Sequence, residues 1–166
     1  LSYPEVRTYI RDQFVNLIKT KYPQVELIAG VATGAIAQGA LVAQELGLPF
    51  VYVRSAAKNH GLENLIEGEY KEGQKVVVVE DLISTGGSSL QAVEALRNAG
   101  CDVLGMVAIF TYGFQKAIDN FTNAHCVLDT LSDYNAMIDL AQKTGYVQES
   151  DVAKLKEWRL SPESYK

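Results

Sequence analysis

The sequence predicts an α/β fold, a doubly wound parallel sheet of about five strands with flanking helices. Short apolar runs, such as the four valines at 76–79, alternate along the chain with segments whose apolar residues recur at helical spacing. The strand candidates are apolar throughout, which is typical of parallel strands covered on both faces. With 166 residues, 48% of them hydrophobic, the chain is expected to form a single domain over residues 1–166.

The first half of the chain is predicted to contain two helices and two strands. Residues 2–5 resemble a capping box with proline in the first turn, and apolar residues follow at helical spacing to about Ile18. Residues 25–30 predict a short buried strand, after which a helix is expected to end at Gly47. Residues 49–54 predict the next strand. The stretch from Ser55 to Gly73 has little periodicity and many charges, so we expect a functional loop there.

The second half continues the alternation of strands and helices. A strand rich in valine is followed by a helix that closes at Gly100, and further strand and helix signals follow. The predicted strands are 75–81, 102–111 and 125–130, and the predicted helices after Gly100 are 114–121, 132–143 and 151–160, the last with Ser150 as its N-cap.

Composition and charge restrict the classes of function. The net charge of −5 and the pI near 5.0 argue against a nucleic-acid binder, which needs a basic surface. Cys101 and Cys126 lack the spacing of a zinc site or disulfide framework, so we expect core thiols. No apolar run approaches the roughly 20 residues of a membrane span, and no signal peptide is visible, so we expect no membrane partner and a cytoplasmic location.

The stretch that follows the valine run carries the strongest chemical signal. Glu80 and Asp81 stand at a predicted strand end, and the loop Ser84-Thr85-Gly86-Gly87-Ser88 leads into a helix. Glycines, hydroxyls and a helix N-terminus together suit a phosphate monoester. The two carboxylates suit ribose hydroxyls, directly or through magnesium and water.

Three other interpretations apply to loops of this kind. A generic strand-to-helix turn, capped by Ser84 or Thr85, remains the structural alternative. A Walker A loop is excluded because no lysine occurs between Lys75 and Lys116. The loop that begins at Gly30 has the wrong glycine spacing for a dinucleotide fingerprint.

The apolar strand, the acid pair and the Ser/Thr/Gly loop resemble the signature of type I phosphoribosyltransferases, which bind 5-phosphoribosyl-1-pyrophosphate (PRPP). Within that family, residues 51–61, with Arg54, Lys58 and His60 before Gly61, look like the catalytic loop of orotate phosphoribosyltransferases. Residues 30–34 resemble their pyrophosphate-side loop. The likeness covers nearly the whole chain.

The resemblance implies roles for particular residues. Glu80 and Asp81 would bind the ribose diol, the loop at 84–88 would hold the 5′-phosphate, and Arg54 would contact the pyrophosphate. Lys58 and His60 are the implied catalytic residues. The full implied set for PRPP and orotate is Arg54, Lys58, His60, Glu80, Asp81, Leu82, Ile83, Ser84, Thr85, Gly86, Gly87 and Ser88.

The resemblance also implies a cofactor and an assembly. Mg²⁺ is expected to arrive with PRPP, either without a direct protein ligand or through Asp81. A homodimer is implied, in which the loop from Ser55 to Gly73 serves the neighbouring subunit. Three departures from the family pattern stand out: Ser55 replaces a common lysine, no arginine follows Phe110, and the family's N-terminal segment is expected to be lacking here.

The expected function is therefore transfer of phosphoribosyl from PRPP to orotate in pyrimidine biosynthesis. A purine or uracil phosphoribosyltransferase and a non-catalytic PRPP sensor are the alternatives. Near the C-terminus, Trp158 is expected to pack the last helices or a subunit interface, and Lys154, Lys156 and Arg159 are expected to form a solvated helix face.

Overall fold

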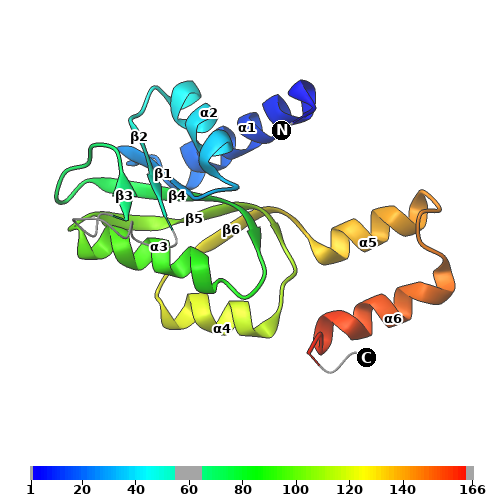
Figure 1. Ribbon diagram of the computed structural model, residues 1–166. Helices are drawn as coiled ribbons and strands as arrows, with labels where there is room; N and C mark the ends of the chain where they lie inside the picture. Colours follow the sequence, from blue (N-terminus) through cyan, green and yellow to red (C-terminus); the bar gives the residue numbers. More distant parts are fainter. Residues whose placement is uncertain (1, 55–64, 164–166) are drawn as a thin grey trace.

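A six-stranded sheet forms the centre of the computed structural model, which describes residues 2–54 and 65–163. The strand order is β3-β2-β1-β4-β5-β6, and every neighbouring pair is parallel except β2 and β3 (Figure 1). The strands are β1 Leu27–Val31, β2 Phe50–Val53, β3 Ile66–Glu67, β4 Lys75–Ile83, β5 Asp102–Thr111 and β6 Leu128–Asp133. The predicted fold class is confirmed, and the sheet has one strand more than the approximate number expected.

The additional strand lies inside the segment expected to be a loop. β3 has two residues and pairs antiparallel with the end of β2, with Val53 opposite Ile66. Such a short strand has no room for an alternating pattern, so the sequence carries no periodic signal for it. The remainder of the expected loop that precedes it, residues 55–64, lies outside the described residues.

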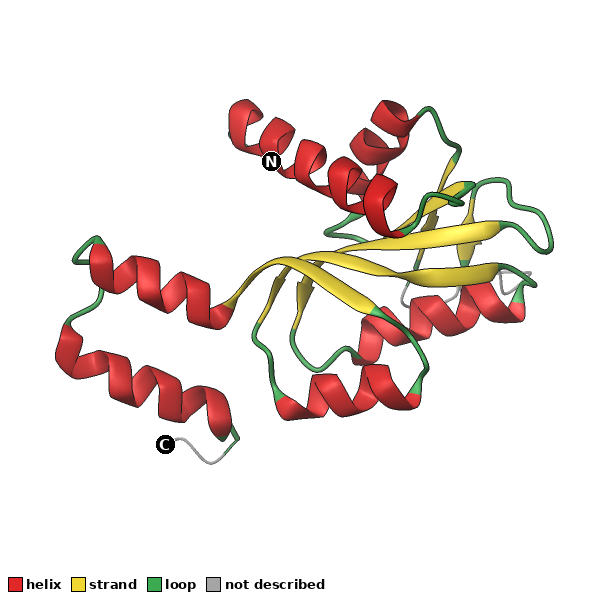
Figure 2. Ribbon diagram, turned by 180° about the vertical axis from the view of Figure 1, so that it is seen from behind, coloured by secondary structure: helices red, strands yellow, loops and turns green. Residues whose placement is uncertain are grey.

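Two pairs of helices cover the two faces of the sheet. α1 (Pro4–Lys21) and α2 (Ile36–Leu46) lie on one face, and α3 (Gly87–Asn98) and α4 (Gln115–Asn123) lie on the other (Figures 1 and 2). The alternate side chains of β4 enter two separate cores. Val77 and Val79 pack with α1 and α2, whereas Val76 and Val78 pack with α3 and α4. Burial on both faces explains why the valine run is apolar throughout.

The chain changes direction across the sheet between β1 and β4. From β1 it proceeds outward to β2 and β3, and it then returns to β4 and proceeds outward to β5 and β6. Ligands of such sheets bind beyond the carboxyl ends of the strands at this switch point. The loops that follow β1 and β4 therefore define where a ligand is expected.

The last two helices extend beyond the carboxyl edge of the sheet as an arm. α5 (Tyr134–Lys143) follows β6 directly, and α6 (Glu149–Leu160) turns back so that its end lies near the start of α4 (Figure 1). Trp158 contacts the rings of Tyr112, Phe114 and Tyr134, with centroid separations of 5.9, 5.7 and 5.4 Å. The expectation that Trp158 packs the C-terminal helices is confirmed.

Several predicted helix caps and strand limits were wrong. Tyr3 is the N-cap of α1 and no side chain bonds there, so the expected capping box does not form. Gln148, not Ser150, is the N-cap of α6. β6 begins later than predicted because Cys126 N–H donates to Phe121 O, which prolongs the turn that ends α4. Cys101 and Cys126 are buried free thiols, as predicted.

Candidate active site

The loop after β1 packs against the end of β4. A Cβ built on Gly34 would lie 1.9 Å from Asp81 Oδ2, so only glycine leaves room for this carboxylate. Ala32 N–H donates to Val53 O at 2.8 Å, which ties the same loop to the end of β2. The loop at 30–34 and the acid pair, predicted separately, thus meet at the switch point between β1 and β4.

The two acids of the pair occupy different environments. Glu80 is 5% exposed, and its carboxylate accepts hydrogen bonds from Ser89 Oγ and from Asp81 N–H, both at 2.9 Å. Burial is the main reason that the pKa of Glu80 is raised to about 7, and the neighbouring charge of Asp81 also raises it. The hydrogen bonds from the Asp81 backbone and from Ser89 lower the pKa and offset part of this rise. Asp81 is exposed. Asp81 is therefore the solvent-accessible carboxylate of the pair, whereas Glu80 is held by hydrogen bonds inside the protein.

The Ser/Thr/Gly loop turns at the start of α3. Gly86 has a φ of 80° and caps the helix, and a Cβ there would lie 2.6 Å from Phe121 Cε2. Asn120 Nδ2 donates to Thr85 O at 2.9 Å, so α4 fixes the loop from below. The side chains of Ser84 and Ser88 are exposed. A fixed loop with exposed hydroxyls and a helix N-terminus is suited to hold a phosphate group.

Leu82 and Ile83, which the resemblance places in the substrate site, continue β4 beyond its predicted end. Leu82 is 42% exposed, whereas Ile83 is fully buried in the core beside α3. Ile83 O accepts from Tyr112 N–H at 3.1 Å. The side chain of Ile83 is thus structural, and only its backbone could serve a ligand.

Arg54 lies directly after β2, at the same edge of the sheet. Its N–H donates to Leu65 O at 2.8 Å, and its Nη1 lies 3.5 Å from Glu67 Oε1. The pairing holds the guanidinium beside Glu67 of β3, the outer neighbour of β2 in the sheet. Lys58 and His60, the predicted catalytic residues, lie outside the described residues.

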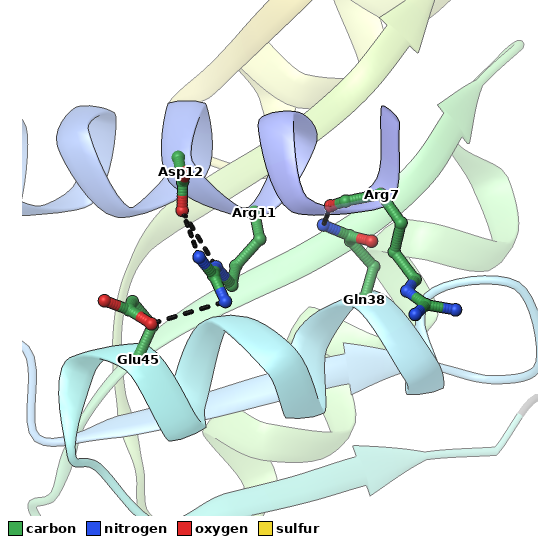
Figure 3. Close-up of polar contacts among 5 residues, drawn as sticks. All are labelled: Arg7, Arg11, Asp12, Gln38 and Glu45. Atoms are coloured by element: carbon green, nitrogen blue, oxygen red, sulfur yellow. Dashed lines mark hydrogen bonds and ion pairs between the residues drawn. The ribbon is translucent and has the colours of Figure 1, made fainter. Parts of the chain in front are cut away.

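Helix α1 closes the site on one side. Gln38 Nε2 donates to Arg7 O at 3.3 Å, and Arg11 Nη1 lies 3.4 Å from Glu45 Oε2, so two polar contacts join α1 to α2 (Figure 3). A cavity of about 350 Å³ lies between α1 and the switch point, and its lining includes Arg7, Gly34 and Asp81. The α1–α2 pair therefore forms one wall beside the Asp81 carboxylate.

The opposite wall comes from β5 and the C-terminal arm. Arg159 Nη1 donates to Gly113 O at 3.3 Å, and a cavity of about 610 Å³ is lined by Arg159 together with Ser84 and Thr85. The expectation of a solvated face was wrong for Arg159, which is half-buried. The reason is tertiary: the neighbouring Trp158 packs on Tyr112 and Phe114, which holds the end of α6 against the segment that follows β5.

The part of the chain that the structure describes contains no cluster of three or more metal-ligating side chains. The donor set at the switch point consists of one exposed carboxylate, Asp81, beside the buried Glu80. One carboxylate suits a magnesium ion that takes its other oxygens from phosphate and water. Within the described residues, no helix has the length and apolarity needed to cross a bilayer.

Sequence reasoning missed two residues of this site and the contacts of two others. Gly34 lies in the recognised loop at 30–34 and Ser89 at the end of the recognised hydroxyl-rich stretch, but the contact of Gly34 with Asp81 and the bond from Ser89 to Glu80 were not predicted. Asn120 and Arg159 reach the site from other helices, and nothing in their local sequence indicates this. The structure brings together Glu80, Asp81 and the loop at 84–88, with Arg54 at the same edge of the sheet.

This combination of fold and site defines a class of protein, and comparison with known proteins agrees with it. Residues 3–140 match the family model described as phosphoribosyl transferase domain. The chain is 60% identical over 162 residues to orotate phosphoribosyltransferase from Bacteroides thetaiotaomicron, covering 98% of this chain and 76% of that protein. It is 56% identical over 166 residues to the orotate phosphoribosyltransferase of Cytophaga hutchinsonii, covering 100% and 79%.

A solved structure supports the same assignment at the level of the fold. The crystal structure of orotate phosphoribosyltransferase from Aeropyrum pernix superposes with a TM-score of 0.76 at 25% identity, covering 88% of this chain and 80% of that one. The chain is thus a phosphoribosyltransferase by fold and by family. Within that class it belongs to the orotate phosphoribosyltransferase family.

Proposed function

We propose that the chain transfers the 5-phosphoribosyl group from PRPP to orotate, giving orotidine 5′-monophosphate and pyrophosphate, a reaction of pyrimidine biosynthesis. The bond from ribose C1 to the pyrophosphate oxygen breaks, and its electron pair leaves with pyrophosphate. A bond forms from C1 to the orotate ring nitrogen, which gives up its proton. The observation that carries the proposal is the Asp81 carboxylate, packed on Gly34 and separated by only Leu82 and Ile83 from the loop at 84–88, which is proposed to hold the phosphate.

In this proposal Asp81 accepts hydrogen bonds from the ribose hydroxyls. The resemblance implies a ribose contact for Glu80 too. Because each of its carboxylate oxygens already accepts a hydrogen bond inside the protein, its main proposed role is to fix the end of β4. The loop at 84–88 holds the 5′-phosphate through backbone N–H groups and hydroxyls. The ribose then spans the gap between the loop and Asp81.

The pyrophosphate is assigned to the side of the site at β1 and β2. Arg54 lies there, and the resemblance adds Lys58 and His60 from the adjoining segment, which lies outside the described residues. Positive groups that face the departing pyrophosphate stabilise the charge that develops as the C1 bond lengthens. These three residues are therefore proposed to assist departure of the leaving group.

Magnesium is proposed to enter with PRPP. The described residues offer Asp81 as the exposed carboxylate that could touch the ion, directly or through water. When bound, the ion would neutralise part of the pyrophosphate charge. Chelation should abolish turnover, and restored magnesium should return it.

A homodimer is also proposed, with the segment between Ser55 and Gly73 reaching the neighbouring subunit. The resemblance to the family supports this assembly. Sedimentation velocity tests it, with a mass of twice 18.2 kDa expected and a monomer contradicting it.

The experiment that tests the function is product analysis with magnesium, PRPP and a panel of orotate, uracil, hypoxanthine and adenine. Orotidine monophosphate should be the product. Relatives at 55–61% identity are named orotate phosphoribosyltransferase, which favours orotate over the purine and uracil alternatives. A nucleotide from another base would refute the assignment, and PRPP binding without any product would favour the sensor.

A further inference from the structure

The strand order indicates where the leaving group and the entering base lie relative to ribose C1. Pyrophosphate is assigned to β1 and β2, and the ribose to Asp81 at the end of β4. In a displacement the entering group approaches opposite the leaving group, so the base is expected on the other side of β4. That side is the carboxyl end of β5, where residues 111–114 meet α6.

Arg159 is the cation at that place. It lines the cavity of about 610 Å³ shared with Ser84 and Thr85, and also a second cavity of about 440 Å³ beside Thr111 and Gly113. The guanidinium therefore lies at the boundary between the phosphate loop and the end of β5.

The surroundings hold Arg159 in place. Its Nη1 donates to Gly113 O at 3.3 Å, and Tyr134 Oη donates to Leu155 O at 3.3 Å one turn earlier on the same helix. Trp158 next to it is enclosed by three rings. The bond to Gly113 engages one of the five N–H donors of the guanidinium, which can present a pair of the others to a carboxylate.

The other charged residues around these cavities do not offer the same group. Lys116 lies 3.9 Å from Glu163, and both side chains are largely exposed, so their charges offset each other. Asp133, in the smaller cavity, accepts from Ala136 N–H as the N-cap of α5. Among the described residues that line the two cavities, Arg159 is the cation without an acidic side chain paired to it.

We propose that Arg159 binds the carboxylate of orotate and thereby selects orotate over uracil. This inference rests on the proposed function. Orotate differs from uracil by that carboxylate alone, and a guanidinium placed on the base side of the ribose recognises the difference by a charge-assisted hydrogen-bonded pair. The C-terminal arm thus contributes a specificity residue to a site otherwise built from the ends of β-strands.

Calorimetric titration with three ligands tests the proposal without turnover. Orotidine 5′-monophosphate and uridine 5′-monophosphate differ only in the carboxylate, and ribose 5-phosphate lacks a base. The wild-type chain should prefer the orotidine nucleotide. Arg159→Ala should weaken its binding about 10- to 100-fold, to the level of the uridine nucleotide, with the other two affinities unchanged. Arg159→Lys should keep part of the preference.

Lys156→Ala, an exposed change on the same helix, is the control and should leave all three affinities unaltered. Persistence of the preference in Arg159→Ala would overturn the inference, as would absence of the preference in the wild type. Equal weakening of all three ligands would also overturn it, since it would assign Arg159 to the phosphate or to folding. Failure of the proposed function is a separate result, since it appears as no orotidine nucleotide in the wild-type product analysis.

Discussion

Gly34 and Asp81 are in contact across the switch point, and a methyl group on Gly34 would occupy the place of Asp81 Oδ2, 1.9 Å away. Gly34→Ala should therefore displace the carboxylate toward solvent. Because Asp81 is exposed, the protein can accommodate this shift with little loss of stability. We expect kcat/KM for PRPP to fall about 10- to 100-fold with a nearly unchanged melting temperature.

Gly39→Ala, a substitution in α2, is the matched control for the general effect of adding a methyl group in a crowded place. Its new methyl would lie 2.8 Å from Phe50 Cε2, away from the carboxylates. This variant should lower the melting temperature while the KM for PRPP stays the same. If Gly34→Ala behaves in the same way, the contact with Asp81 has no role in substrate binding.

Glu80→Gln should change how stability depends on pH. Burial raises the pKa of Glu80 to about 7, above its ordinary value of 4.5. The folded state therefore holds the proton more tightly than the unfolded chain, so the stabilisation is complete below pH 4.5 and is lost as pH rises through about 7. A glutamine side chain cannot ionise, so the variant should escape this loss.

Denaturant unfolding of both proteins at several pH values measures the effect. The advantage of Glu80→Gln should be small near pH 5 and reach about 1 to 3 kcal/mol near pH 9. A difference that stays constant with pH would show that Glu80 does not titrate in this range.

Gly86→Ala should impair both stability and phosphate binding. The φ of 80° disfavours a side chain, and the new Cβ would meet Phe121 at 2.6 Å. We expect a loss of about 1 to 3 kcal/mol in the free energy of unfolding and weaker binding of ribose 5-phosphate. Gly87→Ala is the control for stability, because no atom lies within 4 Å of its Cβ position. Equal destabilisation by the two changes would refute this account of the loop.

Asp81→Asn and Lys58→Ala should affect different steps. Removing the charge of Asp81 should weaken ground-state binding of PRPP. Removing the Lys58 side chain should mainly lower kcat, because Lys58 is proposed to contact the departing pyrophosphate. Separate equilibrium binding and single-turnover experiments distinguish the two. Equal losses of PRPP affinity in both variants would contradict this division.

Periodic segments of the sequence predicted most of the fold. The run at 102–111 and the end of α2 at Gly47 were located correctly, because a buried strand and a left-handed glycine cap leave local signals. The end of β4 was placed too early. Leu82 and Ile83 stay in the sheet because β5 is long enough to pair with them, through Phe110 and Thr111.

The candidate site was predicted where its residues are contiguous. The pair Glu80 and Asp81 and the following loop could be recognised as one motif, but their unequal burial could not, because it depends on Ser89 and on the packing of α3. Arg159 is 46 residues from Gly113, and only the folded arm brings the two together. Contacts of that kind have no local pattern in the sequence.

The most direct test of the central claim is the stoichiometry of pyrophosphate release during orotate consumption by the wild-type chain with magnesium and PRPP. The account predicts one pyrophosphate for each orotate converted to orotidine monophosphate, and no release when orotate is omitted. Pyrophosphate released without orotate, or no release with it, would contradict the claim that the carboxyl edge of β4 is an orotate phosphoribosyltransferase site.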